Sequence, residues 1–157
     1  MSRLILTRGL PGSGKSTYAL KWLSESPTTR CRINNDDLRA SLFGIPKNDS
    51  SFDPTVEKVL RKLRFSLIRL CAESGKDVIV DNLNLSNKLI RGYQNLAREL
   101  GIAFSVKDFS HIPIDVCIQR DSNREFSIGG NEIRKLQEVM RTNQGEFTSL
   151  NLSEPAS

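Results

Sequence analysis

The sequence predicts one α/β domain with a mostly parallel sheet of four or five strands and helices on both faces. Strand-like apolar runs alternate with segments of helical periodicity along most of the chain, and such alternation is typical of parallel sheets. The run Val78-Ile79-Val80 is apolar at every position, as a strand buried on both faces requires. A length of 157 residues suits about one domain.

The composition indicates a folded chain that remains in a reducing compartment. Hydrophobic residues make up 38% and charged residues 26%, which argues against disorder. No apolar run is long enough to span a membrane, and no signal-peptide core is present, so we expect a cytoplasmic protein. The three cysteines are isolated and only one histidine could join them, which excludes a disulfide framework and argues against a zinc site. The net charge of +5 suits an anionic partner and equally suits simple solubility.

The first half of the chain supplies two strands and three helices. An apolar strand at 4–7 leads into a glycine-rich turn, and an apolar stripe marks a helix at 15–25. A weaker strand is expected at 31–33. A short helix follows at 36–43 and ends at Gly44. After a polar loop, apolar residues at helical spacing predict a long helix over 55–72 that Gly75 terminates.

The second half continues the alternation. The clearest strand, 77–81, precedes a helix that Ser86 caps and Gly101 ends. A strand at 102–109 and a helix at 113–123 follow, and Gly130 or Asn131 caps a last helix over 131–141. We therefore expect the domain to span residues 1–141. Residues 142–157 are polar and include Pro155, which predicts a loose tail.

A phosphate-binding loop joins the first strand to the first helix. Residues 9–16 match G-x-x-x-x-G-K-[ST] at every fixed position. Glycines let backbone N–H groups turn toward phosphate oxygens, and the following helix N-terminus favours negative charge. Such a loop predicts binding of ATP or another nucleoside triphosphate, with the lysine on the β- and γ-phosphates and the serine on Mg²⁺. The residues concerned are Gly9, Pro11, Gly12, Ser13, Gly14, Lys15, Ser16 and Thr17.

A charged segment after the second strand is a candidate acceptor site. If a helix begins near Asp36, then Asp36 and Arg39 share a face. The carboxylate could accept a proton from an attacking hydroxyl, and the arginine could hold an anionic acceptor. An acidic helix N-terminus with an exposed arginine explains the same residues equally well. Asp37 is the alternative base.

Polar residues follow the strand at 77–81. Asp81 ends it, and Asn82 and Asn84 come next. An aspartate at this place can hold Mg²⁺ through water or orient an active-site arginine. A simple strand-end turn is the alternative.

Arginines near the end of the chain suggest a lid. Arg120 and Arg124 close a helix ahead of Gly129-Gly130. A helical lid hinged at these glycines would bring an arginine to the transferring phosphoryl group, although the same arginines would also complement a helix C-terminus.

The long helix predicted over 55–72 is basic. Together with Glu73, which follows it, the helix carries five cationic side chains and two carboxylates. This face is either a nucleic-acid contact, a partner-subunit contact or a solvated helix surface.

Together these segments resemble the kinase domain of phage 5′-polynucleotide kinases, over roughly residues 1–141. The resemblance rests on the phosphate loop, on residues 34–39, on the strand and Asn-Leu turn at 80–85, and on the spacing of Arg120 and Arg124. Residues 34–39 read Asn-Asn-Asp-Asp-Leu-Arg here, where the family has Asn-Arg-Asp-Asp-Tyr-Arg. Asn35 departs from the family's arginine, the turn after Asp81 aligns in two ways, and residues 128–130 lack the usual proline.

The resemblance implies a P-loop kinase fold and transfer of the ATP γ-phosphate to the 5′-hydroxyl of DNA or RNA in nucleic-acid end repair. It implies Asp36 as general base, Arg39 on the acceptor's 3′-phosphate, Arg124 acting from the lid, and host cytoplasm as the location if the protein is phage-encoded. No Asp-x-Asp-Gly-Thr motif is present, so we expect no 3′-phosphatase activity; a phosphatase or ligase on separate chains could complete the repair. A small-molecule kinase and a nucleotide-gated binding module are the alternatives.

Overall fold

A four-stranded parallel sheet forms the centre of the computed structural model, which describes residues 2–47, 49 and 51–154. The strand order is β2-β3-β1-β4, and every pair is parallel. This confirms the predicted sheet. The strands are β1 (Arg3–Arg8), β2 (Arg30–Ile33), β3 (Asp77–Val80) and β4 (Ala103–Asp108).

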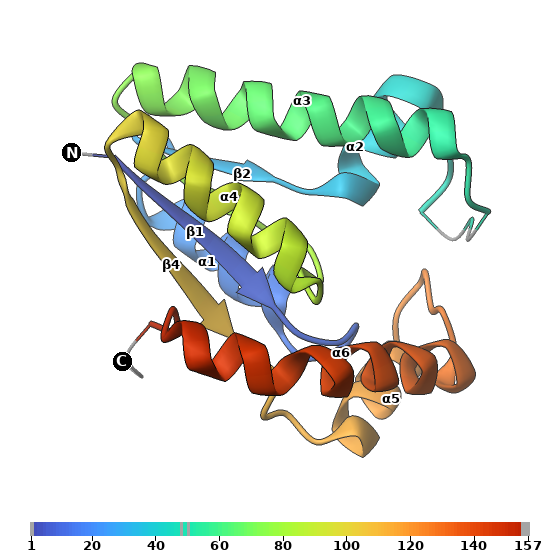
Figure 1. The fold of residues 1–157 in the computed structure, drawn as a ribbon. Coiled ribbons are helices and arrows are strands. Elements are labelled where there is room, and N and C mark those ends of the chain that lie inside the picture. The colour runs from blue at the N-terminus through green and yellow to red at the C-terminus, as the bar shows by residue number, and fades with distance from the viewer. Residues whose placement is uncertain (1, 48, 50, 155–157) are drawn as a thin grey trace.

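Helices cover both faces of the sheet, as predicted (Figure 1). On one face, Ile5 and Ile79 pack with Ala19 and Trp22 of α1. On the other face, alternate strand residues pack with Ile68 of α3, with apolar residues of α4 and with α6. The helices are α1 (Lys15–Glu25), α2 (Asn35–Phe43), α3 (Pro54–Glu73), α4 (Asn87–Leu100), α5 (Ile114–Ser122) and α6 (Gly130–Leu150).

Local capping chemistry sets several helix ends where the sequence predicts them. The Ser86 hydroxyl accepts a hydrogen bond from the Leu89 amide, which makes Ser86 the N-cap of α4. Gly44 and Gly101 adopt positive φ angles of 64° and 66° after α2 and α4, a conformation that favours glycine. The Asn34 side chain caps α2 by accepting from the Asp37 amide, so this helix starts at Asn35 rather than Asp36.

The expected helix end at Arg141 and the loose tail are wrong for the residues that the structure describes. Helix α6 continues to Leu150, because Phe147 is buried against the sheet with only 2% exposure. The Arg8 guanidinium lies 4.0 Å above its ring. Beyond the helix, residues 152–154 pair with Val106 of β4 through two backbone hydrogen bonds. Burial of a few spaced apolar side chains outweighs the polar composition of this segment. Pro155 lies outside the described residues.

Among the described residues, none of the helices combines the length and apolar character needed to cross a membrane.

Candidate functional site

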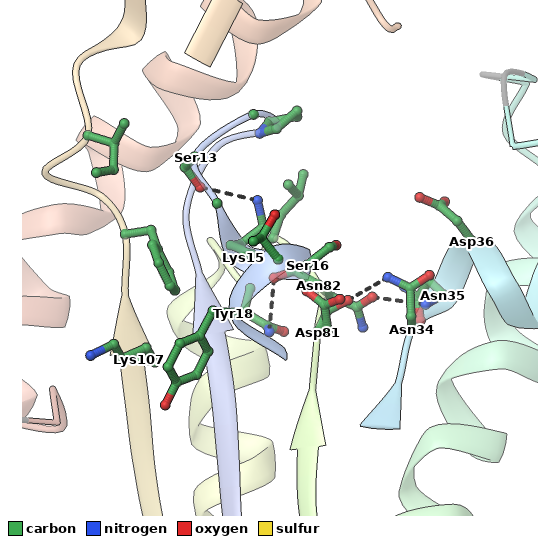
Figure 2. Close-up of a pocket in the computed structure, with 18 of the residues that line it drawn as sticks. Ser13, Lys15, Ser16, Tyr18, Asn34, Asn35, Asp36, Asp81, Asn82 and Lys107 are labelled. Atoms are coloured by element: carbon green, nitrogen blue, oxygen red, sulfur yellow. Dashed lines mark hydrogen bonds between the residues drawn. The ribbon is translucent and has the colours of Figure 1, made fainter. Parts of the chain in front are cut away.

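The carboxyl ends of the strands open into one cleft of about 1470 Å³. This is the edge at which open parallel sheets bind ligands. Figure 2 shows Lys15 and Ser16 in the middle of the cleft, with Tyr18 and Lys107 on one side and Asp36 on the other. The volume exceeds that of an ordinary small-molecule site, which leaves room for two substrates. Of the predicted site residues, all but Gly9 line this cleft.

The phosphate loop has the backbone conformation that its glycines allow. Gly12 and Gly14 have φ angles of +80° and +104°, which L-residues with side chains rarely adopt. A Cβ atom at Gly12 would lie 2.2 Å from the carbonyl oxygen of Cys117 in α5. The loop therefore packs directly beneath α5, and glycine is required at position 12 for both space and conformation.

The Lys15 side chain is buried in the phosphate loop and lacks a strong counter-ion. It is 7% exposed, and its Nζ donates to the Leu10 carbonyl at 2.6 Å and to Ser13 Oγ at 3.4 Å. Burial lowers the pKa of Lys15 to about 8; Asp81 and Cys117 oppose this shift and Arg124 adds to it. A buried ammonium held only by neutral oxygens lacks a strong counter-ion, and phosphate oxygens supply one.

Asp36 and Arg39 meet across one turn of α2, as their spacing predicts. Asp36 Oδ1 accepts from Arg39 Nη1 at 2.8 Å. The Asp36 side chain is 56% exposed, so one carboxylate oxygen is open to the cleft. The same arginine forms a bidentate pair with Glu57 of α3, at 2.8 and 2.9 Å, and this pairing raises the pKa of Arg39. Sequence spacing does not indicate Glu57 as a partner.

A buried ion-pair network links β3 to α2. Asp81, 1% exposed, accepts from Arg32 Nε at 2.9 Å and Nη2 at 2.7 Å, while Arg32 Nη1 donates to Asp37 at 2.7 Å. Asp81 therefore pairs with Arg32, while its predicted roles in holding Mg²⁺ or orienting an active-site arginine stay predictions. Burial opposes ionisation of Asp37, but hydrogen bonds from Lys47 and Arg32 hold its pKa below the usual value. These two cations make Asp37 a weaker base candidate than Asp36.

Arg32 is a residue that the motifs do not reveal. It lies in β2, opposite Ile79 of β3, and only this strand pairing brings it to Asp81. The one usable signal is a charged residue inside an otherwise apolar strand candidate.

The two asparagines after β3 serve different contacts. Asn82 Oδ1 accepts from the Asn35 amide at 2.9 Å, which ties the turn to the start of α2. Asn84 is 4% exposed and donates to the Thr7 carbonyl at 2.7 Å, in a left-handed conformation with φ 49°. Its Oδ1 is buried and accepts no hydrogen bond from the described residues. Asn84 thus shapes the turn under the phosphate loop.

Both predicted lid arginines line the cleft. Arg120 Nη1 lies 3.5 Å from the Gly12 carbonyl oxygen, and Arg124 Nη1 lies 3.6 Å from Asp121. Asp121, which motif analysis passes over, accepts from Ser127 Oγ at 2.7 Å and from the Gly129 amide at 3.0 Å. Burial opposes its ionisation, but these hydrogen bonds keep the pKa of Asp121 low. Asp121 therefore anchors the segment between α5 and α6.

Comparison with known proteins agrees with this geometry. The model of the AAA domain family AAA_33 matches residues 4–149. A protein of Autographa californica nuclear polyhedrosis virus, named as a bifunctional polynucleotide kinase/RNA ligase, is 25% identical over 92% of this chain. Chains of two Pnkp1/Rnl/Hen1 complexes, the second described as an RNA repair complex, superpose with TM-scores of 0.65 and 0.69, at 28% and 24% identity, over 76% and 92% of this chain.

Another solved relative is the APS kinase CysC of Mycobacterium tuberculosis in complex with AMPPNP and APS. It has a TM-score of 0.61 and 22% identity, and the match covers 78% of this chain and 69% of that one. By contrast, the present chain spans 22% of the viral protein and 38% and 46% of the matched chains in the two complexes. With the family model matching nearly its whole length, the chain belongs to the AAA domain family, and its fold matches that of P-loop kinases.

Proposed function

We propose that the protein is a polynucleotide 5′-hydroxyl kinase, which transfers the ATP γ-phosphate to the 5′-hydroxyl of DNA or RNA. One observation carries this proposal: a single cleft brings the phosphate loop, the open carboxylate of Asp36 and the lid arginines together. The likeness to a viral protein with polynucleotide kinase in its name supports it.

The donor side positions the leaving group. Backbone amides of the loop and the α1 N-terminus receive the phosphates, and Lys15 neutralises charge on the β- and γ-phosphates. Arg120 and Arg124 also line the cleft, and Arg120 Nη1 lies beside the phosphate loop, 3.5 Å from the Gly12 carbonyl oxygen. In this position Arg124 stabilises the charge that spreads over the γ-phosphoryl oxygens as the bond to ADP breaks.

The acceptor side positions the nucleophile. Asp36 takes the proton of the 5′-hydroxyl while its oxygen forms the new bond to phosphorus. The bond between the γ-phosphorus and the bridging oxygen breaks, and ADP leaves with that electron pair. Arg39, held by Glu57, keeps Asp36 in place and stands next to the acceptor nucleotide. Asn82 borders the same space.

Ser16 and Asp81 fit a magnesium ion bound with ATP. The Ser16 hydroxyl is exposed in the cleft and forms no hydrogen bond with any described residue. Asp81 Oδ1 has only a 3.4 Å contact to Thr7, while Oδ2 serves Arg32. When bound, Mg²⁺ would neutralise phosphate charge. It characteristically uses one or two protein ligands plus phosphates and water.

Incubation of the protein with γ-labelled ATP, Mg²⁺ and a 5′-hydroxyl DNA oligonucleotide tests the proposal. A matched RNA oligonucleotide and a 3′-mononucleotide run in parallel, with Lys15→Ala as the blank. We expect label at the oligonucleotide 5′ end, absent in the blank. Label on no acceptor, from protein that binds ATP, contradicts the proposal and favours a small-molecule acceptor; ATP-dependent oligonucleotide binding without label would instead indicate a binding module.

The base assignment has its own test. Asp36→Asn removes the proton acceptor and leaves the side-chain shape unchanged, so kcat is expected to fall by about 10²–10⁴. Asp37→Asn is the matched control, because the Asp37 carboxylate is already paired with Arg32 and Lys47. Near-normal turnover of a folded Asp36→Asn variant would show that another group takes the proton.

A further inference from the structure

The acceptor side of the cleft is short of positive charge. Three cations at or beside this side are each paired with carboxylates: Arg32 with Asp37 and Asp81, Arg39 with Asp36 and Glu57, and Lys47 with Asp37. Four carboxylates against three cations leave this set with one net negative charge. A phosphodiester entering here meets repulsion unless a further cation is within reach.

Arg64 of α3 lies next to this side of the cleft: it does not line the cleft itself, but it donates to Asn35, which does. It is 5% exposed, yet it forms no ion pair with any residue that the structure describes. Its Nε donates to the Tyr93 hydroxyl at 2.8 Å and its Nη1 to Asn35 Oδ1 at 2.9 Å. Both acceptors are neutral. A buried guanidinium without a carboxylate is costly to maintain, and an anionic ligand would offset that cost.

The guanidinium is held in a fixed orientation. Tyr93 is fully buried, and its ring stacks on Phe65 with centroids 5.0 Å apart and planes 11° apart. Phe65 in turn lies against Gly92, where a Cβ would be 3.5 Å from the ring. The Tyr93 hydroxyl is therefore a rigid anchor for Arg64, as a preorganised binding group needs.

Asn35 connects Arg64 with the cleft. Asn35 lines the cleft, and its backbone amide is fixed by Asn82 (Figure 2). Because Oδ1 accepts from Arg64, the remaining donor of the carboxamide is Nδ2, which forms no hydrogen bond with the described residues. A cation on the oxygen polarises the amide and makes Nδ2 a stronger donor.

We infer that Arg64 is a positioning residue that acts through Asn35: it orients and polarises the Asn35 carboxamide, whose Nδ2 then meets the first internucleotide phosphate of the acceptor strand. The inference rests on the proposed function. Arg39 is a weaker candidate for this charge, since its Nε and Nη2 are engaged by Glu57 and its Nη1 by Asp36. Arg64 brings the set to four cations against four carboxylates, and no carboxylate among the described residues pairs with its guanidinium.

A substrate-by-variant comparison tests this role. One 5′-hydroxyl oligonucleotide has an ordinary first linkage, and a second has an uncharged methylphosphonate there. For the wild type we expect the charged linkage to lower KM about tenfold to a hundredfold, the range for hydrogen bonds to charged groups. In Arg64→Gln this preference should shrink to about threefold or less, with the KM for ATP unchanged. Lys62→Gln, an exposed cation on the same helix, should keep the full preference.

Folding is separated from positioning by a second variant. Arg64→Lys retains the charge but cannot reach both Tyr93 and Asn35, so we expect a preference for the charged linkage between those of the wild type and Arg64→Gln. If circular dichroism shows that Arg64→Gln is unfolded, the test uses Arg64→Lys in its place. An unchanged preference in the folded Arg64 variants overturns the inference while the proposed function stands. No labelling of either oligonucleotide by the wild type overturns both.

Discussion

Nucleotide binding should draw a proton onto Lys15. The pKa of this lysine is lowered by burial from 10.5 to about 8, so at pH 8.5 about a quarter of the molecules carry the charge. Phosphates placed beside Nζ favour the charged form. If they restore the ordinary pKa, binding takes up about 0.7 proton at pH 8.5. The phosphates of ATP are fully ionised at this pH and do not contribute.

Titration calorimetry at pH 8.5 measures this uptake. The binding enthalpy is compared in two buffers with different ionisation enthalpies, and its slope is the number of protons taken up. The control is Lys15→Arg, because arginine stays protonated in both states and should show a slope near zero. A wild-type slope near zero, or equal slopes in both proteins, would refute the reasoning that Lys15 is largely neutral before phosphate arrives.

The same pKa has a consequence for stability. Between pH 8 and pH 10.5 the unfolded chain binds more protons at Lys15 than the folded one, so stability rises with pH over this range. Below pH 8 the cost of burying the charge is fully present. It amounts to about 3 kcal/mol, taken at about 1.4 kcal/mol for each factor of ten.

Three further perturbations test the packing around the site. Gly12→Ala places a Cβ against the Cys117 carbonyl and should weaken ATP binding at least about tenfold by calorimetry, whereas Gly145→Ala, which meets no atom within 4 Å, should not. Phe147→Ala should lower the free energy of unfolding by about 3–5 kcal/mol in urea titrations; a change below about 1 kcal/mol would contradict docking of the last turns of α6. Asp121→Asn should cost about 1–3 kcal/mol at pH 7, and this difference should vanish as pH falls through the lowered pKa of Asp121, because the wild-type carboxylate then also loses its charge. Equal pH profiles for the two proteins would show that Asp121 does not anchor the segment.

Much of the fold follows from local signals along the chain. The helix starting after Ser86 and ending at Gly101 is predicted by its cap residues alone, because capping hydrogen bonds and left-handed glycines involve neighbours in sequence. For the last helix, by contrast, the sequence predicts an end at Arg141. Its final turns depend on Phe147 reaching Arg8 and the sheet, which no local pattern shows.

The site residues likewise fall into those that the sequence predicts and those that it does not. The loop residues and the Asp36–Arg39 pair are predictable because a contiguous motif and a one-turn spacing define them. Arg32, Glu57 and Arg64 are not. The role of each depends on a partner between 18 and 49 positions away in sequence. A charged residue in a predicted strand or helix does not indicate which distant residue it will contact.

The sequence alone predicts the fold class, the phosphate loop and the kind of chemistry, because short-range geometry and a complete local motif carry that information. The charge balance of the acceptor side depends instead on tertiary contacts. Strand pairing joins Arg32 to Asp81, and packing of α3 beside α2 joins Glu57 to Arg39 and Arg64 to Asn35. Electrostatic interaction depends on distance in space and on burial, and the order of residues along the chain determines neither directly.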